Sequence, residues 1–329
     1  MDSAIIKIAH QLVAPGKGIL AADESSGTIK KRFEALGIED SVENHRKYRE
    51  LLFTTPNIEE YISGVIMFEE TLRQKTADNV SFPDYLGVRG VLPGIKIDQG
   101  LEPFGTSEIE KTTKGLEGLG ERLGGYVGLG AKFTKFRSTF TISSETPTLE
   151  NIAANAEIQA QMAKGSQEKG LLPICEPEVL MDGNHSLSKC QEVTTQVLKE
   201  LFVSLKKYEV DIRQLFVKTN MVLPGKEASK AEPKEVARAT IEALRNSVPA
   251  EVPAIVFLSG GQSPDEACAN LNAIVKTGEK TWELSFSFAR ALQSKAMESW
   301  QGKDKNVKLA QEAFLERARL VSLARQGKL

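Results

Sequence analysis

Cysteine and histidine are scarce in this sequence, and their scarcity limits the metal and redox chemistry that we expect. The 329 residues include three cysteines and three histidines. These are Cys175, Cys190, Cys268, His10, His45 and His185. A zinc site needs three or four ligands, usually from closely spaced His or Cys pairs, and no such spacing occurs. We therefore expect reduced core cysteines, no metal ion and no cofactor, although a metal site built from carboxylates stays open.

Two further absences bear on location and partners. No run of about 18 uncharged apolar residues occurs, so no segment is expected to span a membrane. The first residues, MDSAIIKIAHQLVAPGKG, carry scattered charges and lack the three parts of a secretory signal. With 42 basic and 44 acidic residues, the net charge of -2 gives no basic footprint for nucleic acid. We expect a cytoplasmic protein that binds neither nucleic acid nor membrane.

Short apolar runs alternate with segments of helical pattern along the chain. The runs lie at 18–22, 62–68, 94–97, 131–136, 171–175, 215–217, 254–258 and 284–286. Between them, apolar residues recur every three or four positions, as Val193 and Val197 do. Further helices are predicted to begin at Pro233 and at the capping box of Ser263, and a last one covers about 306–325.

Alternating strands and helices imply parallel strands joined by right-handed crossovers. Eight such units that close on themselves form a (β/α)8 barrel, and we predict a single barrel domain over residues 1–329. An open doubly wound sheet is the alternative, but no G-x-G-x-x-G motif follows the first strand. No repeat or linker divides the chain.

In such a barrel, active-site groups lie at the carboxyl ends of the strands. The residues predicted there are Asp23, Glu24, Ser25, Lys96, Asp98, Lys135, Arg137, Glu176, Glu178, Lys218, Ser259, Gly260, Gly261, Ser287 and Arg290. One charged residue at a strand end is weak evidence. Several lysines and carboxylates that converge in one barrel mouth, however, perturb one another's pKa values, as functional sites do.

Two groups of residues could bind anions. The first is Ser259-Gly260-Gly261 with Ser287 and Arg290, where free backbone N–H groups and a helix N-terminus suit a phosphate; an ordinary turn is the alternative. The second group is Ser25, Thr28, Arg32 and Lys96. Its alternative is a capped helix with a solvated basic face.

The stretch LFVKTNMVLPG, residues 215–225, ends an apolar run with Lys218. Lys218 either points into water or lies in the barrel mouth. In the mouth, burial and the charge of Lys135 could lower a lysine pKa from about 10.4 toward about 7–8. The free amine could then attack a ketone and form an iminium that accepts electrons from a breaking C–C bond. Glu176 is the candidate acid and base for this step, and Asp23 is the candidate base for the hydroxyl group.

The motifs resemble those of class I fructose-bisphosphate aldolase. The matching stretches, in order from about residue 9 to 328, are GKGILAADESSGTIKKR, SGVIMFEETL, GIKIDQG, EPEVL, VKTNMVLPG, FLSGGQS and SFSFARALQ. The resemblance implies reversible, metal-independent cleavage of fructose 1,6-bisphosphate into dihydroxyacetone phosphate and glyceraldehyde 3-phosphate. It also implies a homotetramer.

The resemblance assigns residue roles as well. Lys218 would be the Schiff-base lysine, Glu176 the proton donor and acceptor, and Asp23 the group that handles the C4 hydroxyl proton, with Lys135 and Glu178 as supporting groups. The C1 phosphate would be held by Ser259, Gly260, Gly261, Ser287 and Arg290. The C6 end would face Ser25, Thr28, Arg32, Lys96 and Arg137.

The sequence departs from the family pattern in several places. Thr219 replaces a proline after the lysine, Phe136 replaces a tryptophan, and Phe288-Ala289 replaces a tyrosine-glycine pair. Animal-type members continue to a terminal tyrosine, whereas this sequence ends at Leu329, so we expect cleavage with slower proton exchange. Two alternatives remain: an aldolase that prefers a monophosphorylated ketose, and a catalytically silent sugar-phosphate scaffold.

Overall fold

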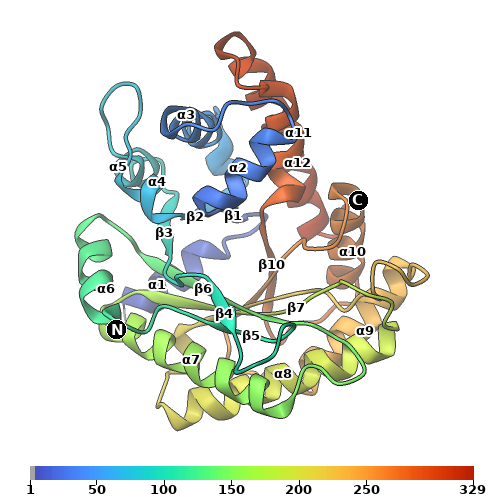
Figure 1. Ribbon diagram of the computed structural model, residues 1–329. Helices are drawn as coiled ribbons and strands as arrows, with labels where there is room; N and C mark the ends of the chain where they lie inside the picture. The colour runs from blue at the N-terminus through green and yellow to red at the C-terminus, as the bar shows by residue number, and fades with distance from the viewer. Residues whose placement is uncertain (1–3) are drawn as a thin grey trace.

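In the computed structural model, which describes residues 4–329, eight parallel strands close into a barrel (Figure 1). Their order around the barrel is β1-β10-β9-β8-β7-β6-β3-β2. Their bounds are β1 Gly18–Ala22, β2 Ile62–Met67, β3 Leu92–Lys96, β6 Phe133–Phe140, β7 Leu172–Val179, β8 Phe216–Thr219, β9 Ala254–Phe257 and β10 Glu283–Phe288. The predicted (β/α)8 barrel is confirmed, and each of the eight predicted strands is present.

Helices surround the barrel, and α7 and α8 run side by side along one flank (Figure 1). Their bounds are α1 Ala4–Leu12, α2 Ser26–Glu34, α3 Val42–Phe53, α4 Glu69–Arg73, α5 Phe82–Gly87, α6 Leu119–Gly128, α7 Leu149–Glu168, α8 Leu187–Lys207, α9 Pro233–Arg245, α10 Pro264–Lys276, α11 Arg290–Trp300 and α12 Val307–Arg325. Three short 3₁₀ turns are η1 Ile58–Glu60, η2 Ile212–Gln214 and η3 Asp304–Asn306. No described helix is both long and apolar enough to cross a membrane.

Local signals account for the helix boundaries that the sequence predicts. Pro233 is the first residue of α9. Ser263 caps α10, where its side chain and that of Glu266 form the reciprocal capping box. The last helix, α12, ends at Arg325 before Gly327, whose φ of 69° is the left-handed conformation that commonly follows a helix.

The amino-terminal half of the barrel interior is apolar. Phe133, Ile174, Phe216 and Val256 pack there with residues of α1, including Leu12. The interior is so full that a Cβ at Gly94 would come within 2.3 Å of the Phe133 ring. This packing leaves the opposite, carboxyl end of the barrel for polar groups.

Strands β6 and β7 each extend beyond the predicted run, to Phe140 and Val179. The predictions stopped near the first charged residues, at 136 and 175. Alternation along β6 explains the difference, because Phe136 and Phe140 pack in the helix-facing core whereas Lys135 and Arg137 line the barrel mouth. Charged residues within these strands therefore belong to the inner face of the barrel.

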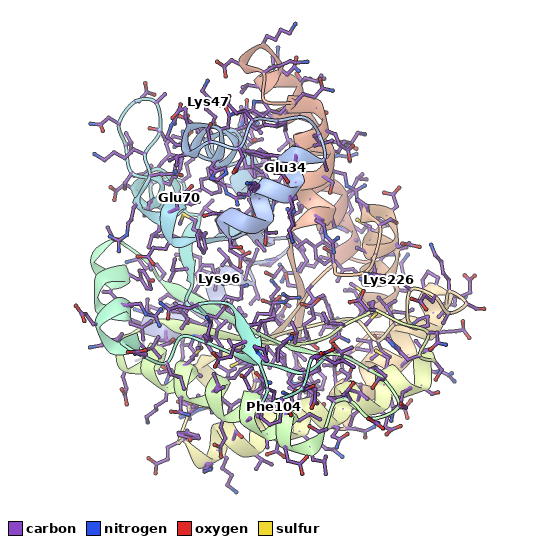
Figure 2. The ribbon with its side chains drawn as sticks, viewed as in Figure 1. Glu34, Lys47, Glu70, Lys96, Phe104 and Lys226 are labelled. Atoms are coloured by element: carbon purple, nitrogen blue, oxygen red, sulfur yellow. The ribbon has the colours of Figure 1, made fainter. Side chains whose placement is uncertain are left out.

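A hairpin that the sequence does not predict follows β3. It pairs β4 Leu101–Pro103 with β5 Lys111–Thr113, and Phe104 lies just after β4 (Figure 2). Its base is fixed by Thr113, whose N–H donates to Asn155 Oδ1 at 3.2 Å and whose hydroxyl donates to the Arg137 carbonyl at 2.9 Å. The hairpin thereby holds Leu101 beside the barrel mouth.

Candidate active site

A cavity of about 530 Å³ opens at the carboxyl ends of the barrel strands. It is lined by Ala21, Asp23, Glu24, Ser25, Thr28, Arg32, Lys96, Asp98, Gly100, Leu101, Lys135, Arg137, Glu176, Glu178, Lys218, Leu258, Ser259, Gly260, Ser287, Ala289 and Arg290. Of the site residues predicted from the sequence, all except Gly261 lie in this lining. In Figure 2, Lys96 lies over the middle of the molecule, whereas Lys47 lies at its outer edge.

Two lysines share one carboxylate in the deepest part of this cavity. Lys218 Nζ lies 3.0 Å from Glu176 Oε1, and Lys135 Nζ lies 3.0 Å from Glu176 Oε2. Lys135 Nζ also lies 2.5 Å from Asp23 Oδ2. The two lysine side chains are each 4% exposed. Lys218 is therefore buried in the barrel mouth. The alternative interpretation, in which Lys218 points into water, does not hold.

The charges in this cluster support one another. Burial alone would raise the pKa of Asp23, but Lys135 and Lys218 hold that pKa below its ordinary value. Burial would likewise raise the pKa of Glu176, and the same two lysines lower it. Burial would lower the pKa of Lys135, but Asp23 and Glu176 raise it. Both carboxylates are thus ionised at neutral pH, ready to accept protons.

Asp98 belongs to the site although it was not among the predicted catalytic or binding residues. Its Oδ1 lies 2.5 Å from Lys96 Nζ, and its Oδ2 accepts a hydrogen bond from the Arg137 N–H at 3.2 Å. Lys96 is therefore held by this buried carboxylate through its ammonium group, and Arg137 is held by it through its backbone N–H. The signal in the sequence is the spacing in GIKIDQG, because residues two apart on a strand share a face.

Glu178 and Arg137 form a second ion pair across β7 and β6, with Arg137 Nε donating to Glu178 Oε2. Gly260 lies directly against this pair, since a Cβ there would come within 2.8 Å of Glu178 Oε1. The loop after β9 can approach the β7 carboxylate this closely because residue 260 has no side chain.

Arg32 is held by a carboxylate instead of standing free in the cavity. Glu24 accepts from Arg32 Nη1 and also lies 2.8 Å from Arg49 Nη2, which belongs to α3. Nearby, the hydroxyls of Ser25 and Thr28 lie 3.1 Å apart at the start of α2. Glu24 thus joins β1 to α2 and α3, and it fixes the direction in which Arg32 points.

The structure places Gly261 and two of the residues that depart from the family pattern, Ala289 and Thr219. Gly261, with φ of 77°, lies against Met181, where a Cβ would meet Met181 Cγ at 2.5 Å, and it is outside the lining of the cavity. Ala289 precedes α11 with φ of −102°, a value that does not require glycine. Thr219 is buried in β8, where it pairs with Phe257 of β9.

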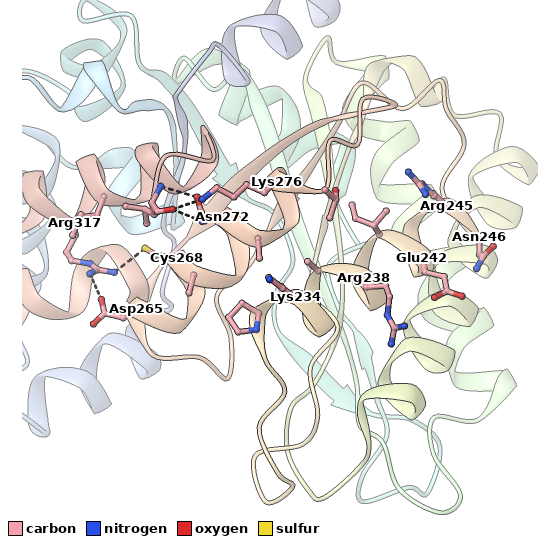
Figure 3. Close-up of a pocket in the computed structure, with 18 residues that line it drawn as sticks. Lys234, Arg238, Glu242, Arg245, Asn246, Asp265, Cys268, Asn272, Lys276 and Arg317 are labelled. Carbon is pink, nitrogen blue, oxygen red and sulfur yellow. Dashed lines mark hydrogen bonds and ion pairs between the residues drawn. The ribbon is translucent and has the colours of Figure 1, made fainter.

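A larger hollow, of about 1110 Å³, lies outside the barrel between α9, α10 and α12 (Figure 3). Its walls carry Lys234, Lys276, Glu242 and Asp265, but among the described residues neither lysine is ion-paired with a carboxylate side chain. Arg317 is paired there with Asp265 at 2.7 Å, and Lys276 donates to the Leu329 carbonyl at 2.6 Å (Figure 3). The smaller cavity, with its buried lysine–carboxylate pairs, is therefore the candidate active site. Among residues 4–329, no group of three or more His, Cys, Asp or Glu is arranged to hold a metal ion.

A closed parallel barrel with a buried amine–carboxylate cluster at its carboxyl end defines a (β/α)8-barrel enzyme. Comparison with known proteins identifies the family. The family model for class-I fructose-bisphosphate aldolase matches residues 4–329, and the chain belongs to this family. Its members are aldehyde-lyases that cleave fructose 1,6-bisphosphate reversibly through a lysine Schiff base, so the predicted family and activity are confirmed.

Similar proteins come from distant organisms. "Fructose-bisphosphate aldolase 6, cytosolic" of Arabidopsis thaliana is 48% identical, over 99% of this chain and 94% of its own length. Fructose-bisphosphate aldolase of Echinococcus multilocularis is 49% identical, over 97% of this chain and 89% of its own. The aldolase of Plasmodium falciparum, solved in complex with TRAP and a small-molecule inhibitor, superimposes with a TM-score of 0.97 at 44% identity, over 99% of this chain and 94% of that one.

Proposed function

We propose that Lys218 forms the Schiff base with the C2 carbonyl of fructose 1,6-bisphosphate. The observation that carries this assignment is Glu176, whose two oxygens each lie 3.0 Å from a lysine Nζ, one of Lys218 and one of Lys135. A general base must lie about 2.6–3.2 Å from the heavy atom whose proton it takes. Glu176 accepts a proton from the Lys218 ammonium and so frees the amine for attack.

The remaining steps use Lys218, Glu176 and Asp23. The amine adds to C2, a proton passes from its nitrogen to the former carbonyl oxygen to give the carbinolamine, and Glu176 returns its own proton to that hydroxyl group, which leaves as water and gives the iminium. Asp23 takes the C4 hydroxyl proton, the C3–C4 bond breaks, and its electrons pass to the iminium nitrogen. Glyceraldehyde 3-phosphate departs. Protonation of the enamine at C3 and hydrolysis of the iminium then release dihydroxyacetone phosphate and restore Lys218.

Lys135 has a supporting role in this mechanism. Its ammonium contacts both Asp23 and Glu176 and is buried with them. It holds both carboxylates in their ionised forms, the forms that accept protons, and it fixes their separation. Glu178 supports the site through its pair with Arg137 and its contact with the Gly260 loop.

The two phosphate groups are assigned to two different sets of residues in the cavity lining. Ser259, Gly260, Ser287 and Arg290 come from β9, β10 and the start of α11, where backbone N–H groups and a guanidinium suit the C1 phosphate. Gly261 adjoins this group. Ser25, Thr28, Arg32, Lys96 and Arg137 are assigned to the C6 end. The cations at both ends favour a bisphosphate over a monophosphorylated ketose.

Borohydride trapping tests the assignment of Lys218. The protein is incubated with dihydroxyacetone phosphate, reduced with borohydride, and digested for peptide mapping. We expect a stable adduct at Lys218, no adduct in Lys218→Met, and a slower-forming adduct at Lys218 in Lys135→Met. An adduct at Lys135 or at no lysine would contradict the mechanism. A protein that binds the sugar phosphate but forms no adduct would be the silent scaffold instead.

We further propose a cytoplasmic homo-oligomer, a tetramer by family resemblance, with the barrel as one domain. The names of the Arabidopsis relative and of the Cicer arietinum relative, "Fructose-bisphosphate aldolase, cytoplasmic isozyme", support the location. Sedimentation of the purified protein tests the assembly, and a single monomeric species at micromolar concentration would contradict it.

A further inference from the structure

The barrel wall contains a seam beside the catalytic lysine. Strands β7 and β8 pair through Ile174 with Phe216 and through Cys175 with Val217, and their pairing ends there. If this register continued for one more residue on each strand, Glu176 would pair with Lys218. On the other sides the wall is continuous, because β6 pairs with β7 as far as Val179 and β8 pairs with β9 as far as Thr219.

Asn220 bridges this seam with its side chain. Its Oδ1 accepts a hydrogen bond from the Val179 N–H of β7 at 3.0 Å. Its Nδ2 donates to Thr194 Oγ1 on α8 at 3.2 Å and to the Met221 carbonyl at 3.1 Å. The side chain is 1% exposed, so these bonds have no competition from bulk water. One amide thus ties the end of β7, the end of β8 and α8 together.

The bridge lies close to the chemistry. Asn220 is two residues after Lys218, and Val179 is three residues after Glu176. The two strand segments between these residues lack the paired register that would otherwise fix their separation. The distance of 3.0 Å between Glu176 Oε1 and Lys218 Nζ therefore depends on the contacts that hold the carboxyl ends of β7 and β8 in place.

We propose that Asn220 is a positioning residue that sets the separation of β7 and β8 where Glu176 meets Lys218. The inference rests on the proposed roles of Glu176 and Lys218. Asn220 does not line the substrate cavity, so it acts only through the strands that it joins. Displacement of a catalytic group by about 1 Å can cost about 10²-fold in rate.

A matched control lies on the same segment. The Val222 N–H donates to Thr240 Oγ1 on α9 at 2.9 Å, and both residues are buried. Like the bond from Val179 to Asn220, this bond pairs a buried backbone N–H with a side-chain oxygen. It joins the segment after β8 to α9, however, and does not involve β7. Thr240→Val should therefore destabilise the fold much as Asn220→Ala does, without opening the seam.

The test compares Asn220→Ala with Thr240→Val in steady-state cleavage of fructose 1,6-bisphosphate and in the rate of borohydride-trapped adduct formation. For Asn220→Ala we expect kcat to fall about 10- to 100-fold with KM within about 3-fold, because the phosphate-binding residues are untouched. Thr240→Val should keep kcat within about 3-fold. The acid limb of the kcat profile should move to higher pH in Asn220→Ala alone, since a weaker Lys218 contact raises the Glu176 pKa.

A second variant keeps the proposal falsifiable if Asn220→Ala does not fold. Thr194→Val removes one acceptor of the Asn220 amide and leaves its bond to Val179, so kcat should fall about 2- to 5-fold. Parental kcat in Asn220→Ala, equal losses in Asn220→Ala and Thr240→Val, or, where Asn220→Ala does not fold, parental kcat in Thr194→Val would overturn the inference. Absence of an adduct at Lys218 in the parent protein would instead overturn the proposed mechanism, and the inference with it.

Discussion

Gly260 and Glu178 are placed so closely that a side chain at residue 260 would require Glu178 to move. A Cβ at Gly260 would come within 2.8 Å of Glu178 Oε1, while the other oxygen of Glu178 accepts from Arg137. The loop after β9, which is assigned to the C1 phosphate, and Arg137, which is assigned to the C6 end, therefore both contact the Glu178 carboxylate.

Gly260→Ala should disturb activity more than folding. The added methyl group meets the end of a flexible side chain, so we expect Glu178 to shift and kcat/KM to fall about 10- to 100-fold. Gly124→Ala is the matched control, because nothing lies within 4 Å of a Cβ there and Gly124 is within helix α6. Steady-state kinetics and circular dichroism of both variants check this expectation, and parental kinetics in Gly260→Ala would refute it.

Lys96→Ala should reveal whether the C6 end selects a bisphosphate. Because Lys96 lies on β3, away from the C1 phosphate group, we expect KM for fructose 1,6-bisphosphate to rise about 10-fold and KM for fructose 1-phosphate to change less than about 2-fold. Lys132→Ala, which removes an exposed lysine before β6, controls for net charge. Equal effects on the two substrates would point to the monophosphate preference.

Lys135→Met should destabilise the fold in a pH-dependent way. Removing one partner from a buried ion pair costs about 3–5 kcal/mol, since Asp23 and Glu176 then lose a counter-charge. Their folded-state pKa values lie below the ordinary values, so their contribution to stability is present above the ordinary pKa and is lost as pH falls through the folded-state pKa.

The difference in free energy of unfolding between parent and Lys135→Met should therefore be larger at pH 7 than near pH 2, which lies below the ordinary pKa values of both carboxylates. Urea titrations at several pH values measure it. Lys132→Ala again serves as the control, and its difference from the parent should stay near zero throughout. A Lys135→Met difference that grows as the pH falls would contradict the assigned charges.

The thiols should be inert in the folded protein. Cys175, Cys190 and Cys268 are all buried, and burial raises the pKa of Cys190 to about 11. At pH 8 we expect each to react with a disulfide reagent at least about 10²-fold more slowly than the exposed thiol of Val203→Cys, and all three to react after unfolding. Fast reaction of any native thiol would show that the core opens there.

Much of the fold can be predicted because each strand signal is local. Apolar runs bounded by turns marked all eight barrel strands, and Ser263 and Pro233 marked helix starts. The strand lengths were less predictable, since Lys135 and Glu176 look like the end of a buried run although they continue it on the inner face. The β4–β5 hairpin escaped notice because its strands are three residues each and β4 is exposed.

For the site, the sequence by itself determined which residues meet: parallel strands in a barrel bring their carboxyl ends to one mouth, so the positions of Lys218, Lys135 and Glu176 along the chain sufficed. Only the tertiary structure decided how they pair. That Glu176 divides its oxygens between two lysines, and that Asn220 closes the seam beside them, depends on distances between strands that are set by packing across the barrel and not by any one segment.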